Sequence, residues 1–207
     1  MFDSIIKQVG TIELPAFTGA QIYMQKHVIG DAVRLENAPD FEPVVERMLL
    51  GVELPMGSEV FITVDQKSVK VGATHRRGGA HVDGNYIFDW GGSDQDGGGG
   101  GWLTGVNGRV LSPENHQLQY CNPNGGMLIT SDHQACRAWE GTFHGQPNQG
   151  GDCTHLTQDL EQNESFLLEP NRVYLSNSTC VHESLPLEAD VDRTLVRITL
   201  PPVAILN

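Results

Sequence analysis

The chain has 207 residues, with 26 acidic and 13 basic side chains and a formal net charge of −13. This length fits a single domain with a substantial hydrophobic core, so we expect one domain over residues 1–207. The negative charge disfavours nucleic acid and anionic membranes as the main partner. No apolar stretch approaches the roughly 20 residues that cross a bilayer, so we expect no membrane segment.

The cysteines indicate the redox environment. None of the four has CxxC spacing, and the N-terminus shows neither the basic start nor the long apolar run of a signal peptide. We therefore expect reduced thiols and a cytoplasmic location.

Residues 1–38 predict short strands, and one amphipathic helix follows. Its apolar side chains recur at i, i+3, i+4, i+7 and i+8, which is the pattern of a helix with one buried face. They are Phe41, Val44, Val45, Met48 and Leu49. Asp40 is placed to cap this helix and Gly51 to end it.

The pattern changes to β at residue 59. Residues 60–64 and 69–72 predict a hairpin with a polar turn at 65–68, which leads into a strand carrying His81. The glycine-rich run 91–101 predicts a loop, either a lid beside a site or a surface insertion. Further strands are expected at 117–120, 127–130, 136–143, 166–168 and 173–175, with a short helix near 156–160. Several short strands separated by turns favour a sandwich or barrel.

His81 and Asp83 form the first candidate site. Side chains i and i+2 of a strand share a face, so an imidazole and a carboxylate project into one space. We expect His182 to complete a metal site with them, because two histidines and one carboxylate form the facial triad of non-haem iron oxygenases. The same ligand types also admit manganese or cobalt.

Two arginines follow His182 on one predicted strand. Arg193, Leu195, Arg197 and Thr199 share one face, whereas Thr194, Val196, Ile198 and Leu200 share the other. Two guanidinium groups that point the same way from a buried strand need an anion or a carboxylate as partner.

The order His81-x-Asp83, His182 and then Arg193 eleven residues later resembles the Fe(II)/2-oxoglutarate-dependent dioxygenases, in the style of the prolyl and phytanoyl hydroxylases. The resemblance implies a mainly β fold, a double-stranded β-helix (jelly roll, cupin-like) with one or two flanking helices. Residues 59–200 would form the barrel and residues 1–58 an N-terminal flanking segment with the helix.

The resemblance also implies a chemistry. Three protein ligands leave positions on Fe(II) for 2-oxoglutarate and O₂. Arg193 or Arg197 would hold the distal carboxylate of the cosubstrate as a two-donor fork. The prime substrate would be a small molecule or a side chain in a peptide or protein.

Other residues have weaker claims to the site. Arg76 and Arg77 could bind an anionic substrate at the barrel mouth, and Asn85 and Tyr86 follow the ligands closely enough to contact substrate. His75 is expected beside the metal ligands or in solvent.

Several alternatives stay open. In a cupin-type metalloenzyme without 2-oxoglutarate, His75 would be an extra ligand. A jelly-roll binding or structural module would need no catalysis. Cys180 shares the predicted face of His182, so it is either a thiolate ligand or a small buried side chain.

Overall fold

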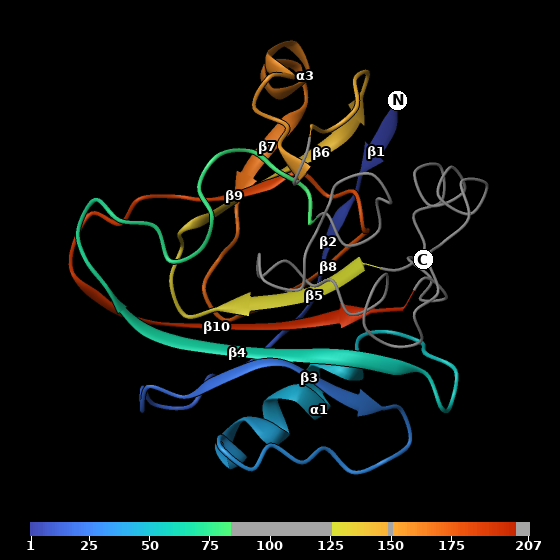
Figure 1. The fold of residues 1–207 in the computed structure, drawn as a ribbon, viewed down its shortest axis with the longest axis vertical. Coiled ribbons are helices and arrows are strands. Elements are labelled where there is room, and N and C mark those ends of the chain that lie inside the picture. Colours follow the sequence, from blue (N-terminus) through green and yellow to red (C-terminus); the bar gives the residue numbers. More distant parts are fainter. Residues whose placement is uncertain (84–125, 149–150, 202–207) are drawn as a thin grey trace.

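The structure is a computed structural model that describes residues 1–83, 126–148 and 151–201. In these residues the fold is mainly β, with two antiparallel sheets and few helices (Figure 1), which confirms the expected class. The elements in chain order are β1 (Phe2–Ser4), β2 (Ile6–Thr11), β3 (Gln21–Val28), the 3-10 helix η1 (Pro39–Phe41), α1 (Glu42–Leu49), β4 (Glu59–Val69), β5 (Gly126–Ser131), β6 (Cys136–Phe143), α3 (Thr157–Gln162), β7 (Glu164–Leu167), β8 (Arg172–Ser176), β9 (His182–Ser184) and β10 (Val191–Leu200).

The two sheets differ in size. The large sheet has six strands in the order β2-β8-β5-β10-β4-β3, and the small sheet joins β1, β6 and β7, with β9 also paired to β6. In Figure 1 the large sheet lies across the lower half of the molecule, with α1 below it, and β6, β7 and α3 lie above. The expected strands near 127–130, 136–143, 166–168 and 173–175 are confirmed as β5 to β8.

Strand β10 is buried on both faces. Val196, Ile198 and Leu200 pack in the main core with the buried face of α1. On the opposite face Leu195 packs with Ala138 of β6, so that face looks toward the small sheet. The predicted alternation is therefore confirmed, and it directs Arg193 and Arg197 into the space between the sheets.

The helix forms where the periodicity predicts it, but its start differs. The apolar residues Val44, Val45 and Met48 are buried in the core. The predicted cap at Asp40 is wrong, because the chain enters the helix through the 3-10 turn and Phe41 takes the cap position without a side-chain hydrogen bond. Burial of the apolar stripe, worth about 2 kcal/mol for each large side chain, fixes the helix instead.

The predicted turn at residues 65–68 is also wrong. Strand β4 runs unbroken from residue 59 to 69 and pairs with both β3 and β10. Gln66 is only 2 % exposed, yet its Nε2 donates to Thr194 Oγ1 (3.0 Å) and its Oε1 accepts from the Ala20 backbone N–H (3.0 Å). Polar residues stay inside this strand because their hydrogen bonds are satisfied there.

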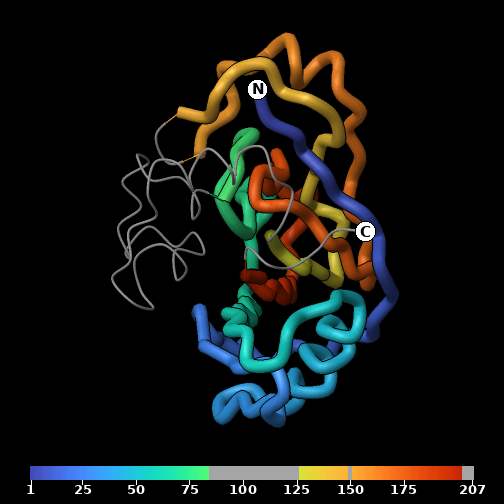
Figure 2. The backbone as a smooth tube through the Cα atoms, turned by 90° about the vertical axis from the view of Figure 1, so that its right-hand side faces the viewer, coloured from blue at the N-terminus to red at the C-terminus, as the bar shows by residue number. Residues whose placement is uncertain are grey.

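The N-terminal segment does more than flank the sheets. Figure 2 shows the blue N-terminal chain passing along one side of the molecule from the small sheet toward α1. Strand β1 pairs with β6, β2 with β8, and β3 with β4. The short helix expected near 156–160 is confirmed as α3. The predicted glycine-rich loop at 91–101 and the predicted strand at 117–120 lie outside the described residues.

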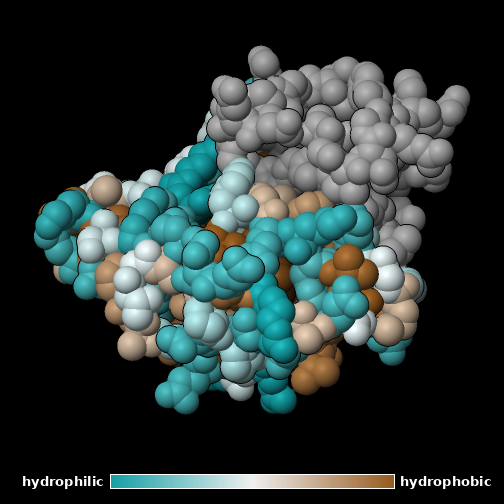
Figure 3. Space-filling model, turned by 60° about the horizontal axis from the view of Figure 1, so that its bottom comes forward, coloured by the Kyte–Doolittle hydropathy of each residue, from teal (hydrophilic) through white to brown (hydrophobic). Residues whose placement is uncertain are grey.

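The surface on the α1 side is mainly hydrophilic (Figure 3). Hydrophobic areas on this face are small and separated by polar side chains. The apolar stripe of α1 therefore faces the large sheet, and the exposed face of the helix is the polar one.

Candidate metal centre

A backbone bridge brings two histidines together. The His81 N–H donates to the His182 carbonyl and the His182 N–H donates to the His81 carbonyl, both at 2.9 Å, and the ring centroids lie 4.6 Å apart. The expected strand around His81 is wrong in extent, because the residue forms isolated bridges with His182 and Asp152. Reciprocal backbone hydrogen bonds to His182 of β9 hold the main chain at His81 in place.

Each imidazole is oriented by a backbone carbonyl. His81 Nδ1 lies 2.7 Å from the Gly79 oxygen, and His182 Nδ1 lies 3.0 Å from the Cys180 oxygen. A carbonyl only accepts, so both Nδ1 atoms carry the proton and both Nε2 atoms keep a lone pair. This tautomer is the one in which a histidine binds a metal through Nε2.

Asp83 supplies the third ligand atom. Its Oδ1 lies 3.9 Å from His182 Nε2, and its Oδ2 accepts a hydrogen bond from Arg197 Nη1 at 2.8 Å. One ligand atom from each of His81, Asp83 and His182 lies within 4.8 Å of the others. The structure therefore brings the three predicted ligands into one group.

The dimensions of this group suit a metal ion. With bonds of about 2.1 Å, neighbouring ligand atoms of an octahedral ion lie about 3 Å apart, somewhat closer than His182 and Asp83 are here. Arg197 occupies one carboxylate oxygen, so Asp83 has one oxygen for a metal bond. Two imidazole nitrogens and one carboxylate oxygen form the donor set of a facial triad.

The electrostatics prepare these groups for a cation. Burial, and next the neighbouring His182, lower the pKa of His81 to about 4, so its ring is neutral at pH 7. Burial disfavours the charged form of Asp83, but Arg197, followed by the two histidines, outweighs it and holds the carboxyl pKa well below its usual range. A neutral imidazole beside an ionised carboxylate is the state that binds a metal.

The two arginines have different surroundings. Arg197 is bound to the ligand Asp83. Arg193 is 1 % exposed; its Nε donates to Ser131 Oγ (3.1 Å), and its Nη1 has no hydrogen-bond partner in the described residues. The sequence proposed either arginine for the cosubstrate. Arg197 Nη2 also lacks a hydrogen-bond partner in the described residues, so the two differ in that Arg197 already binds a carboxylate whereas Arg193 binds a hydroxyl.

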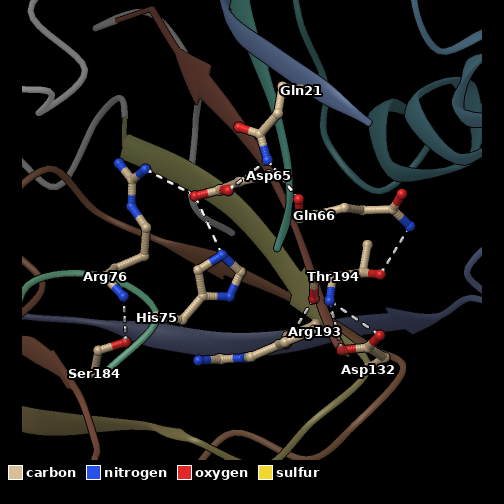
Figure 4. A network of polar contacts seen from close by, with 10 residues as sticks. Gln21, Asp65, Gln66, His75, Arg76, Asp132, Ser184, Arg193 and Thr194 are labelled. Atoms are coloured by element: carbon tan, nitrogen blue, oxygen red, sulfur yellow. Dashed lines mark hydrogen bonds and ion pairs between the residues drawn. The ribbon is translucent and has the colours of Figure 1, made fainter. Parts of the chain in front are cut away.

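A second buried polar network lies near Arg193 (Figure 4). On β4, Asp65 Oδ1 accepts from Gln21 Nε2 (3.0 Å). Asp65 Oδ2 accepts from Arg76 Nη1 (3.1 Å) and lies 3.2 Å from His75 Nε2. Burial is the largest single influence on the Asp65 carboxyl and raises its pKa. The contacts with His75, Gln21 and Arg76 together outweigh burial and hold the pKa well below its usual range. The sequence missed Asp65 because residues 65–68 were interpreted as a turn.

The proposed substrate residues are only partly placed. Arg76 is bound to Asp65, so it belongs to that network, whereas Arg77 is exposed and lowers the pKa of His81 through its charge. Asn85 and Tyr86 lie outside the described residues.

A small pocket adjoins Asp83 and His182. Met127 at the start of β5, Asn177 after β8 and Thr199 on β10 contribute to its wall. Within the described residues no lysine or arginine lines it, and Asp83 is the one charged side chain in its wall. Apart from Thr199, which shares a face with the arginines, no sequence pattern indicated these wall residues.

The two competing ligands do not join the group. His75 pairs with Asp65 and is not one of the three clustered residues in the described parts of the chain. Cys180 is buried among apolar side chains, and burial raises the pKa of its thiol to about 12. In the described parts of the chain Cys180 does not belong to the group of clustered ligand atoms, which favours the small buried side chain of the two alternatives.

No protein-family model, curated protein or solved structure matches this chain. In the part of the chain that the structure describes, no helix is long and apolar enough to span a membrane.

Proposed function

We propose that the protein is an Fe(II)- and 2-oxoglutarate-dependent dioxygenase on a double-stranded β-helix, hydroxylating a small molecule or a peptide or protein side chain. The observation that carries the proposal is the convergence of His81, Asp83 and His182 within 4.8 Å, with both Nε2 atoms free to bind. The two facing antiparallel sheets support the jelly-roll assignment.

The three ligands would hold Fe(II), and Arg193 would hold the distal carboxylate of 2-oxoglutarate. When bound, the iron and cosubstrate supply an oxidative hydroxylation in which 2-oxoglutarate is converted to succinate and CO₂. Three protein ligands suit this reaction because they leave metal positions for the cosubstrate and O₂.

The chain's own residues contribute orientation and charge. The carbonyls of Gly79 and Cys180 fix the histidine tautomers, and Arg197 fixes Asp83 through one oxygen. Arg193 lies four residues before Arg197 on the same face of β10, about 13 Å along the strand. Its unpaired Nη1 donor lies in the same space between the sheets. A guanidinium in a buried site binds a carboxylate with two parallel hydrogen bonds.

A second candidate is a metalloenzyme of the cupin type that needs no 2-oxoglutarate. The pairing of Arg197 with Asp83 favours it, because one of the two candidate cosubstrate anchors is already occupied. A binding module without catalysis is the third possibility, and the cytoplasmic location stays a prediction.

One experiment separates these functions. The protein is incubated in air with Fe(II) and 2-oxoglutarate, without a prime substrate, and succinate is measured. The dioxygenase should form succinate slowly, His182→Ala should abolish it, and His144→Ala, a change at an exposed histidine on Asp159, should not. Metal binding without succinate would favour the cupin-type enzyme, and absence of both would leave a binding module.

A further inference from the structure

Two fully buried polar side chains lie next to each other without all their partners. Arg193 and His75 are each 1 % exposed. In residues 1–83, 126–148 and 151–201, Arg193 Nη1 and His75 Nδ1 have no hydrogen-bond partner, and His75 Nε2 has only the 3.2 Å ion-pair contact with Asp65 Oδ2. Because buried polar groups are normally paired, two such atoms in one place indicate a site for a ligand.

Figure 4 shows how the two side chains lie. The His75 ring stands between the Asp65 carboxylate and the Arg193 guanidinium. Charge interactions of His75 with both neighbours support this arrangement. The ligand site is therefore on the side of His75 that faces away from Asp65.

The Asp65 contact fixes the tautomer of His75. A carboxylate accepts, so the Nε2 atom 3.2 Å from Asp65 carries the proton and Nδ1 is a bare acceptor. An anion beside Arg193 would meet a donor on the arginine but a lone pair on the histidine. Protonation of Nδ1 would turn that lone pair into a second donor.

We propose that Arg193 and His75 form one buried subsite for the carboxylate of 2-oxoglutarate remote from the metal, and that His75 takes up a proton from solvent when the acid binds. The proposal rests on the proposed function and deepens it, because it adds His75 as a positioning residue and gives the cosubstrate site a dependence on pH.

The charges around His75 explain why its ring would be protonated only when the ligand is bound. Asp65 and Lys67 on β4, Arg193 on β10 and the adjacent Arg76 are the charged groups near it. Burial lowers the pKa of His75, Asp65 raises it, and Arg193 and Lys67 lower it. A carboxylate bound to Arg193 offsets the charge of that arginine, so it favours the protonated ring.

The test compares two 2-oxo acids on the full chain loaded with Fe(II) without oxygen. Binding of 2-oxoglutarate and of pyruvate, which lacks the distal carboxylate, is measured by calorimetry in two buffers with different ionisation enthalpies at neutral pH. We expect proton uptake approaching one proton with 2-oxoglutarate beyond that with pyruvate. Equal uptake with both acids would overturn the role of His75 while leaving the dioxygenase proposal standing.

Variants give an independent measure. His75→Asn should weaken 2-oxoglutarate binding roughly ten-fold or more, since a charge-assisted hydrogen bond is lost, and should leave pyruvate and Fe(II) binding unchanged. His144→Asn serves as the control and should match wild type. Unchanged 2-oxoglutarate affinity in His75→Asn would contradict the subsite.

The two proposals fail in different ways. If Fe(II)-loaded wild type binds neither acid, the dioxygenase proposal fails and the subsite with it. The wild-type comparison in two buffers needs no variant, so a folding defect in His75→Asn does not remove the test.

Discussion

Arg197 on β10 and Asp83, which follows the His81 bridge, form a hydrogen-bonded ion pair with 2.8 Å between Nη1 and Oδ2. Arg197 is only 6 % exposed, and it shares the face of β10 on which Leu195 packs with Ala138 of β6. It joins the large sheet to the candidate metal ligands. One oxygen of the Asp83 carboxylate, Oδ2, is therefore already hydrogen-bonded within the protein.

Removing the arginine should destabilise the metal-free protein more than the metal-bound one. In Arg197→Met the Asp83 carboxylate, which is largely but not fully buried, stays without its cation, which costs about 3 kcal/mol of unfolding free energy. A bound metal compensates that charge, so it should stabilise the variant more than wild type. Urea denaturation with a chelator and with added metal measures both states, with Arg197→Lys as the control that keeps the charge. An equal gain from metal in the variant and in wild type would contradict this role.

The metal-free protein should lose stability in mild acid because of His81. The pKa of this ring is lowered to about 4 from 6.5, so between these pH values the unfolded chain binds more protons than the folded one. The unfolding free energy should therefore fall as the pH falls from 6.5 to 4, by about 3 kcal/mol from His81 alone. Urea denaturation across this range measures the loss. His81→Gln should reduce the pH dependence but not remove it, because burial also lowers the pKa of His75. An unchanged profile would be inconsistent with a buried neutral His81.

The described cysteines should behave as buried thiols and not as metal ligands. Cys136, Cys153 and Cys180 are free and buried, and burial raises the pKa of each to about 12. Iodoacetamide should label these three only after unfolding, as peptide mass spectrometry can show. Cys180→Ala should keep the metal affinity of wild type. A marked loss of affinity would return Cys180 to the list of ligands.

A methyl group at Gly126 should disrupt the wall of the pocket beside Asp83. Gly126 opens β5 with φ +134°, and an added Cβ would overlap the backbone of Ser176 and Asn177. Gly57 also has a positive φ (+81°) but open space around its Cβ position, so Gly57→Ala costs only the backbone strain, about 1 kcal/mol. Gly126→Ala should lose clearly more, and thermal denaturation of both variants measures the difference. Equal losses would mean that the close backbone approach is absent.

Much of the fold and the ligand set could be predicted from local patterns. The helical periodicity of Val44, Val45 and Met48 and the strand alternation of residues 193–200 both reflect one buried face, which a sequence displays directly. The group His81, Asp83 and His182 was predictable because the chemistry of a facial triad restricts its ligand types.

The tertiary structure decided what spacing cannot encode. Residues 65–68 have turn-like composition, yet β4 continues through them because Gln66 and Asp65 find partners on other strands. The different surroundings of Arg193 and Arg197 arise from contacts with residues more than 60 positions away, Ser131 and Asp83. Long-range pairing of polar groups, which no local pattern specifies, is the physical reason that only the folded chain distinguishes these two arginines.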